Sequence, residues 1–128
     1  MHNKIYHLKQ LINLEADIEL AVVVGSQALC TATENSDWDI AIRWNRLLAP
    51  LQRVAKSETL RRLLAKKLAV SENKIDLIDL SNARLAMRAA VAEEGIVLKG
   101  DDNLAWSHFL LRTWRDLESF YWDQIYAP

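Results

Sequence analysis

The chain has 128 residues, of which 51% are hydrophobic and 26% are charged, and its formal net charge is −1 at pH 7. This length and composition predict one folded domain, residues 1–128, and exclude a disordered chain. A net charge near zero provides no overall field for nucleic acid, so direct nucleic-acid binding is not expected. The chain has no run of roughly 20 apolar residues and no apolar signal segment, so we expect a cytoplasmic protein without membrane contact.

The first predicted elements are an amphipathic helix and a buried strand. Within residues 4–15, apolar side chains recur at helical spacing, at Ile5, Leu8, Leu11 and Ile12. This spacing predicts a helix that packs on a sheet. A strand is predicted over residues 18–24, because it contains a Val-rich apolar run that ends at a glycine, which is the pattern of a buried strand.

Gly25 and Ser26 follow this strand and form a predicted phosphate-binding turn. Ser26 is a favourable N-cap for a short helix over residues 27–31, and a helix start presents free N–H groups and a positive dipole end to an anion. Gly25 lacks the Cβ atom that would keep a phosphate away from the backbone. Cys30 falls within this short helix, where we expect it to pack as a small apolar residue. As the only cysteine it cannot form an intrachain disulfide, which agrees with a reducing compartment.

Asp37 and Asp39 begin a second predicted strand, residues 38–44. Side chains two residues apart in a strand point to the same face, so the two carboxylates lie together. Such a pair repels unless a cation joins it, and carboxylate oxygens suit Mg²⁺. Arg43 lies on the same face, and contact with a phosphate and pairing with a carboxylate are both open for it.

Residues 45–69 combine regularly spaced leucines with many Lys and Arg residues, which predicts a helix. Either one long helix or two helices that meet near Ser57 fit the pattern. We expect the basic residues to form the solvated side of this helix. Contact with RNA or with an acidic partner surface is the alternative.

A third strand is predicted over residues 74–80, and it contains two aspartates. Alternation places Asp76 and Asp79 on opposite faces, so only one of them can face the carboxylates of the second strand. Residues 82–94 then look helical, Gly95 fits a helix stop, and residues 96–98 read as a short final strand.

The last predicted helix covers about residues 104–126, after the candidate N-caps Asp101, Asp102 and Asn103. One apolar stripe follows helical spacing and is expected to pack on the core: Trp106, Leu110, Trp114, Leu117 and Tyr121. Other large apolar residues fall outside that stripe: Phe109, Leu111, Phe120 and Trp122. This helix therefore has more apolar surface than one face can bury, and we expect residues 103–126 to contact a partner protein.

Taken together, Gly25-Ser26, a ten-residue gap and Asp37-Trp38-Asp39 resemble the signature of the nucleotidyltransferase fold of the DNA polymerase β type, over about residues 5–100. The short chain resembles most closely the minimal nucleotidyltransferases (MNT) that are paired with HEPN toxins. It has Leu29-Cys30 where family members commonly carry Arg-Gly, and Trp38 where they carry a small or aliphatic residue. The resemblance implies an α/β fold with a small mixed sheet, packed helices and a long C-terminal helix.

The resemblance also implies the roles of the site residues. Asp37, Asp39 and Asp76 would be the catalytic and metal-binding residues, with two Mg²⁺ ions. Gly25 and Ser26 would hold the phosphates of the substrate ATP. Asp79 would then be a residue that ends or caps the third strand.

The implied function is that of an antitoxin that adenylylates a tyrosine hydroxyl of a HEPN ribonuclease toxin, with which it forms a hetero-oligomer. Two alternatives remain open. The chain could neutralise its toxin by masking it without catalysis, or it could be a small-molecule nucleotidyltransferase that completes its site by dimerisation.

Overall fold

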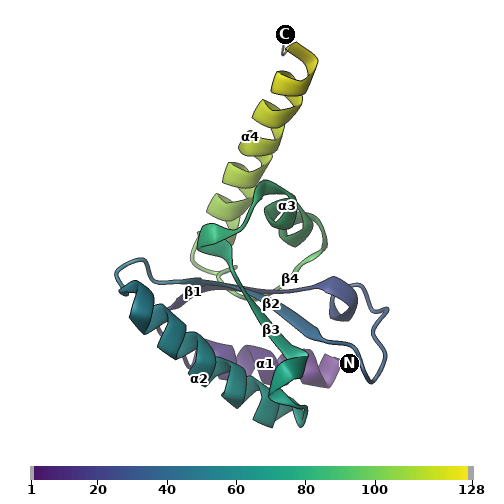
Figure 1. The fold of residues 1–128 in the computed structure, drawn as a ribbon, viewed down its shortest axis with the longest axis vertical. Coiled ribbons are helices and arrows are strands. Elements are labelled where there is room, and N and C mark those ends of the chain that lie inside the picture. The colour runs from purple at the N-terminus through teal and green to yellow at the C-terminus, as the bar shows by residue number, and fades with distance from the viewer. Residues whose placement is uncertain (1, 127–128) are drawn as a thin grey trace.

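The computed structural model describes residues 2–126, which form a four-stranded sheet with helices on both faces (Figure 1). β1 (Ile18–Val24) and β2 (Trp38–Trp44) are antiparallel neighbours at its centre. β3 (Ile75–Asp79) lies parallel to β2 at one edge, and β4 (Ile96–Lys99) lies antiparallel to β1 at the other. The small mixed sheet predicted from the sequence is confirmed, and β1 and β2 have the predicted bounds.

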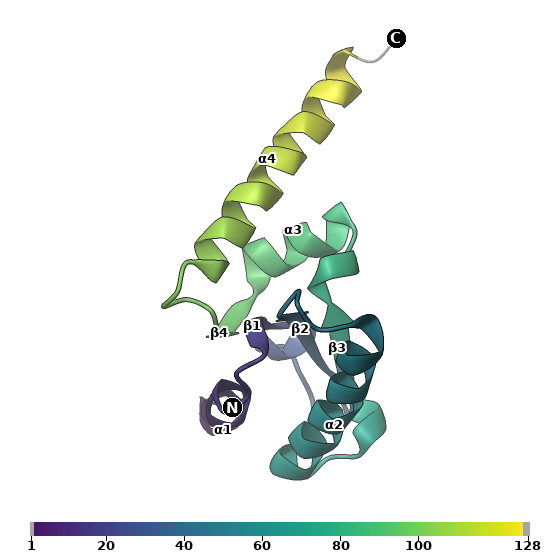
Figure 2. The ribbon, with the colours of Figure 1, turned by 90° about the vertical axis from the view of Figure 1, so that its left-hand side faces the viewer.

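The helices cover the sheet in pairs. α1 (His2–Asn13) and α2 (Pro50–Leu68) pack on one face, and α3 (Leu85–Glu94) and α4 (Ala105–Tyr126) lie on the other (Figure 2). Short 3₁₀ helices, η1 (Gly25–Gln27), η2 (Glu72–Lys74) and η3 (Leu80–Asn82), adjoin strand ends. Within residues 2–126, no helix is both long enough and apolar enough to cross a membrane.

Two hydrophobic clusters hold these layers together, and β1 contributes to both. Its side chains alternate between the α1/α2 cluster, which contains Ala21 and Val23, and the α3/α4 cluster, which contains Leu20 and Val22. A strand that is buried on both faces has no polar face, which explains the apolar sequence from Leu20 to Val24. The first helix packs as predicted, since Leu8 and Ile12 are fully buried in the α1/α2 cluster.

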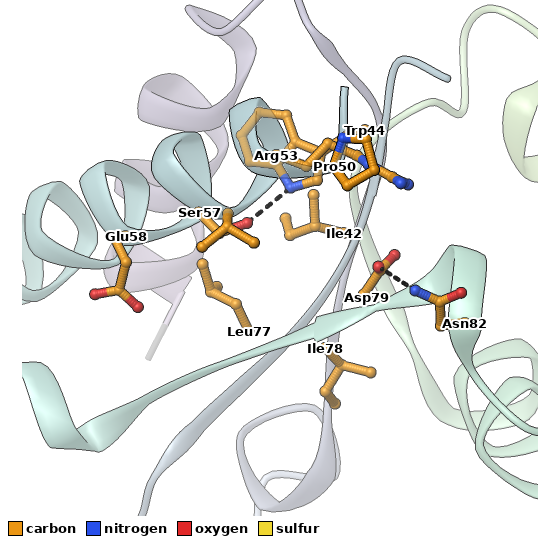
Figure 3. A pocket seen from close by; sticks show the side chains of 11 residues that line it. Ile42, Trp44, Pro50, Arg53, Ser57, Glu58, Leu77, Ile78, Asp79 and Asn82 are labelled. Carbon is orange, nitrogen blue, oxygen red and sulfur yellow. Dashed lines mark hydrogen bonds between the residues drawn. The ribbon is translucent and has the colours of Figure 1, made fainter. Parts of the chain in front are cut away.

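α2 is a single helix, and it begins five residues later than predicted. Its first residue is Pro50, which suits the first helical position because the proline ring fixes φ and the N–H would lack a partner there. Ser57 does not interrupt the helix: its Oγ accepts a hydrogen bond of 3.0 Å from Trp44 Nε1 (Figure 3). The basic side of α2 makes ion pairs with nearby acids, such as Lys56 with Asp17 at 3.0 Å and Arg61 with Glu58 at 2.7 Å.

α3 begins three residues later than predicted because residues 80–82 form η3 instead. Gly95 follows α3 directly, as predicted for a helix stop, with φ −72°. A Cβ atom at Gly95 would overlap Val22 Cγ1 and would lie 2.5 Å from the carbonyl oxygen of Val91. The glycine therefore allows the end of α3 to pack closely against β1.

α4 packs on the core with a different face from the predicted one. Its buried residues are Ala105, Phe109 and Thr113, whereas Trp114 is 43% exposed and Tyr121 is 61% exposed. Only the first half of the helix lies over the sheet, and the second half extends away from the domain (Figures 1 and 2). The aromatic stripe therefore does not reach the core along most of its length. The predicted cap is present, because Asn103 Oδ1 accepts a hydrogen bond from the Ala105 N–H at 3.2 Å.

Candidate active site

The turn after β1 begins at Gly25, which has a φ of +72°. A side chain is strained in this region of backbone conformation, and glycine is not. A Cβ atom here would also lie 2.5 Å from Asp39 Oδ2. Gly25 therefore lets the carboxylate of Asp39 approach the turn closely.

The predicted helix over residues 27–31 is wrong in its start and its cap. The structure has the single turn η1, which starts at Gly25, and the residue before it makes no side-chain capping bond. The turn begins at Gly25, whose φ is positive, so Ser26 lies inside the turn and cannot cap it. Cys30 is exposed rather than packed. Any phosphate held here would be bound by backbone N–H groups and the Ser26 hydroxyl, because a single turn has little macrodipole.

Pairing of β2 with β3 brings two of the predicted aspartates together. Asp39 and Asp76 are direct partners in the parallel register, so their side chains point to the same face of the sheet. Asp39 is half-buried and Asp76 is exposed. Asp37 lies just before β2, and its side chain is 58% exposed. Asp39 therefore lies beside the turn at Gly25, with Asp76 next to it on β3 and Asp37 two residues before it in the chain.

The electrostatics of Asp39 suit a cation. Burial raises the pKa of Asp39 above its usual value, and the negative charges of Asp76 and Asp37 raise it further. A bound divalent ion would compensate both effects. Within residues 2–126, no group of three or more His, Cys, Asp or Glu side chains is arranged to hold a metal ion. The adjacent pair Asp39 and Asp76 still fits Mg²⁺, because proteins commonly hold this ion with one or two carboxylates while phosphate oxygens and water complete the shell.

Lys74 is a residue of this region that sequence reasoning missed. Its Nζ donates a hydrogen bond of 2.9 Å to the carbonyl oxygen of Asn35 and lies 3.9 Å from Asp37 Oδ1. It thus joins the loop before β2 to the start of β3. The available signal was its position immediately before the third strand, beside the start of β2 in a parallel pair.

Asp79 lies away from this site. It is opposite Ile42 in the strand register and therefore points to the α1/α2 face. Its carboxylate accepts hydrogen bonds of 2.9 Å from the Ser81 N–H and from Asn82 Nδ2, which makes it the cap of η3 (Figure 3). The cavity of about 280 Å³ shown in Figure 3 lies on that side, between α2 and β3, and none of the three site aspartates lines it.

Arg43 pairs with a carboxylate, but not with one of the predicted aspartates. Its guanidinium lies 3.6 Å from Glu19 Oε2, on the same face as Asp39 and four residues further along β2. Of the two contacts left open by the sequence, the structure therefore shows the ion pair.

A comparison with known protein families agrees with this arrangement. The family model described as polymerase beta, nucleotidyltransferase, matches residues 6–104. The chain belongs to this nucleotidyltransferase family. The matched segment contains the turn at Gly25 and all three aspartates, so the resemblance predicted from Gly25-Ser26 and Asp37-Trp38-Asp39 is confirmed at the level of the family.

Solved structures of toxin–antitoxin complexes resemble this nucleotidyltransferase. A crystal structure of a toxin–antitoxin with AMP-PNP has a chain that is 27% identical, with a TM-score of 0.69 over 96% of this chain and 92% of that one. A mutant MntA toxin–antitoxin has a chain at 25% identity, with a TM-score of 0.69 over 98% and 94%. A tri-AMPylated Shewanella oneidensis HEPN toxin in complex with MNT antitoxin gives 21% identity and a TM-score of 0.64 over 95% and 93%, which shows a shared fold. No match was found among curated proteins.

Proposed function

We propose that this nucleotidyltransferase is an antitoxin that transfers AMP from ATP to a tyrosine hydroxyl of a HEPN ribonuclease toxin in the cytoplasm. The observation that carries the proposal is the pairing of Asp39 with Asp76 beside the turn at Gly25. The likeness to a toxin–antitoxin crystallised with AMP-PNP supports the nucleotide, and the AMPylated toxin in the Shewanella oneidensis complex supports the acceptor protein.

In this proposal the chain's own groups bind and orient the nucleotide. The N–H groups of the turn and the Ser26 hydroxyl hold the β and γ phosphates. Asp37 and Asp39 would hold Mg²⁺, and Asp76 would help to hold a second ion. When bound, these ions neutralise charge on the phosphates and lower the pKa of the acceptor hydroxyl.

The proposed transfer is an in-line displacement. The tyrosine oxygen forms a bond to the α-phosphorus, the bond between that phosphorus and the bridging oxygen breaks, and pyrophosphate leaves with the electron pair. The hydroxyl proton passes to solvent. Asp39 is half-buried and lies close to the turn at Gly25, so its carboxylate is beside the expected position of the phosphates before the nucleotide arrives.

In this proposal the toxin supplies the acceptor hydroxyl. We propose that α4 provides the contact. A cavity of about 400 Å³ lies on its outer half, and Trp114, Tyr121, Trp122 and Ile125 are among its lining residues. Exposed aromatic residues that cluster on one surface are typical of protein interfaces.

The test is the intact mass of the cognate toxin after incubation with this chain, ATP and Mg²⁺. We expect mass gains in steps of about 329 Da, one for each AMP added by metal-dependent transfer. The gains should disappear with Asp39→Ala, which removes a metal ligand, and persist with Asp101→Ala, which removes an exposed acid outside the site. A toxin whose mass does not change in the presence of the wild-type chain would contradict the proposal.

The exposed aromatic surface of α4 also favours a second candidate, neutralisation by masking alone. Masking would leave the mass of the toxin unchanged, and Asp39→Ala would still protect RNA from cleavage by the toxin. Labelling with radioactive ATP tests the remaining alternative, a small-molecule nucleotidyltransferase. Such an enzyme would place the label on a soluble acceptor rather than on the toxin.

A further inference from the structure

A third cavity, of about 460 Å³, lies on the α3/α4 side of the sheet at the far end of β2. Its lining includes four arginines, one histidine and one acid: Arg43, Arg46, Arg88, Arg112, His108 and Glu19. Arg43 follows Asp39 by four residues, which corresponds to about 13 Å along a strand. Ala41 lies between them and is fully buried, so packed core separates this basic pocket from the aspartates.

The basic pocket has a surplus of positive charge. Arg88 pairs with Asp116 at 2.9 Å, and Arg43 lies 3.6 Å from Glu19. Arg46 and Arg112 are exposed, and neither forms an ion pair with any carboxylate in the part of the chain that the structure describes. Two guanidinium groups therefore remain available at the pocket.

Arg43 is the least satisfied of these groups. Its side chain is only 20% exposed, and its buried Nε has no hydrogen-bond partner among residues 2–126. Burial lowers the pKa of Arg43; Glu19 opposes this effect, and the positive charges of Arg112 and Arg46 add to it. An anion in the pocket would give the Nε–H an acceptor and would reduce the repulsion among the three arginines.

We propose that this basic pocket binds the phosphate group of a nucleotide, either free in solution or already attached to the partner toxin. Guanidinium groups match the geometry of phosphate oxygens and bind them through paired hydrogen bonds. The cavity also has apolar walls at Leu80 and Phe109, which offer a surface for the sugar or base. The pocket itself is independent of the proposed function, whereas the attached source of phosphate rests on it.

The first experiment is isothermal titration of the full chain with AMP and with pyrophosphate, in EDTA and at low salt. Arg46→Ala and Arg112→Ala should each weaken binding by about tenfold, because each removes a charge-assisted contact. One control should bind like the wild type: Lys66→Ala removes an exposed cation on the opposite face of the sheet. Equal affinities for the wild type and both arginine variants would overturn the proposal.

A second measurement identifies the source of the phosphate. The affinity of the chain for AMP-modified toxin is compared with its affinity for unmodified toxin, in the wild type and in Arg112→Ala. Tighter binding of modified toxin that Arg112→Ala abolishes would assign the site to the attached AMP, and equal binding would assign it to free nucleotide. If the toxin is never modified, the proposed function fails, while the titration with AMP still decides whether the pocket binds nucleotide.

Discussion

At the scale of single residues, Gly25 has two reasons to be glycine. An alanine would be strained at φ +72°, and its Cβ would overlap the carboxylate of Asp39 at 2.5 Å. We expect Gly25→Ala to lower the free energy of unfolding by about 1–3 kcal/mol and to reduce AMP transfer. Urea denaturation and intact mass check the two effects.

Ser26→Ala is the matched comparison for this change, because it removes only a hydroxyl next to the same backbone. It should leave the urea midpoint close to that of the wild type and raise the KM for ATP by about 3- to 10-fold, the range for one lost hydrogen bond. If the two variants lost stability equally, the steric role given to Gly25 would be wrong.

Asp39 should make stability depend on pH in an unusual direction. Its pKa is raised in the folded chain, so the folded state binds this proton more tightly than the unfolded state does. Its contribution to stability therefore falls as pH rises from the ordinary pKa to the raised one, and stays lower above it. At pH 7 without metal, we expect Asp39→Asn to unfold at a higher urea concentration, although solvent screening keeps the gain below about 1 kcal/mol.

The effect of Mg²⁺ on stability also tests the inferred charge repulsion at Asp39. Mg²⁺ should raise the melting temperature of the wild type at pH 7, and it should have less effect on Asp39→Asn, which lacks the charge that the ion compensates. An exposed acid outside the site, changed in Asp102→Asn, should leave both responses as in the wild type. A variant Asp39→Asn that is less stable than the wild type would contradict the inferred repulsion.

At the scale of elements, the contact between α3 and β1 depends on Gly95. A methyl group there would overlap Val22 Cγ1 and press on the carbonyl oxygen of Val91, which is backbone and cannot rotate away. We expect Gly95→Ala to lower the free energy of unfolding by about 1–3 kcal/mol, in the range for overpacked cores. A double-mutant cycle with Val22→Ala should show coupling, because the smaller residue removes one of the two overlaps. Strictly additive losses would show that Val22 is not the obstacle.

The strands of the sheet could be predicted because a buried strand is apolar and a half-buried strand alternates apolar and polar residues, and both patterns are visible in the sequence. β1 is an apolar run that ends at Gly25, and β2 alternates from Trp38 onward, so both strands have the predicted bounds. The start of α2 was missed because Leu47 and Leu48 continue the apolar pattern through a turn that precedes Pro50. Helical periodicity alone cannot tell a stripe that meets the core from one that faces solvent, which is why the packing face of α4 was predicted wrongly.

In the candidate site, too, some residues could be predicted from the sequence and others could not. Gly25, Ser26 and the aspartates lie in short motifs with recognisable spacing, and the strand register then places Asp39 opposite Asp76. Lys74 was missed because its contact with Asn35 joins residues far apart in the chain and depends on β2 and β3 being neighbours; only its position directly before β3 pointed to it. The basic pocket is of the same kind, since Arg43, Arg88 and Arg112 come from three separate elements.

At the scale of the whole molecule, the domain divides into a compact body and an extended half-helix. Trp122 is 52% exposed on the part of α4 that projects from the body (Figure 1). We expect Trp122→Ser to weaken binding to the toxin by about 30-fold or more, as for an aromatic residue at the centre of an interface. Its melting temperature should not change, since the side chain contributes little to the core. Titration of purified toxin with the variant chain measures the loss.

Leu51→Ser is the control for this prediction, because Leu51 is 83% exposed on α2 and lies outside α4. It should bind the toxin like the wild type. Equal losses for the two variants would mean that α4 is not the contact surface, and a change in melting temperature for Trp122→Ser would mean that the helix end supports the fold.

The parallel pairing of β2 with β3 also has a consequence for the order of folding. The hairpin of β1 and β2 joins neighbouring segments and can form early, but β3 can reach β2 only after the long connection through α2 has closed. That late step brings Asp76 beside Asp39, so two like charges meet during the docking of β3. Refolding at low ionic strength should therefore be slow at this step and should accelerate with added salt. On the ribosome, the nascent chain would acquire its nucleotide site only after β3 has emerged.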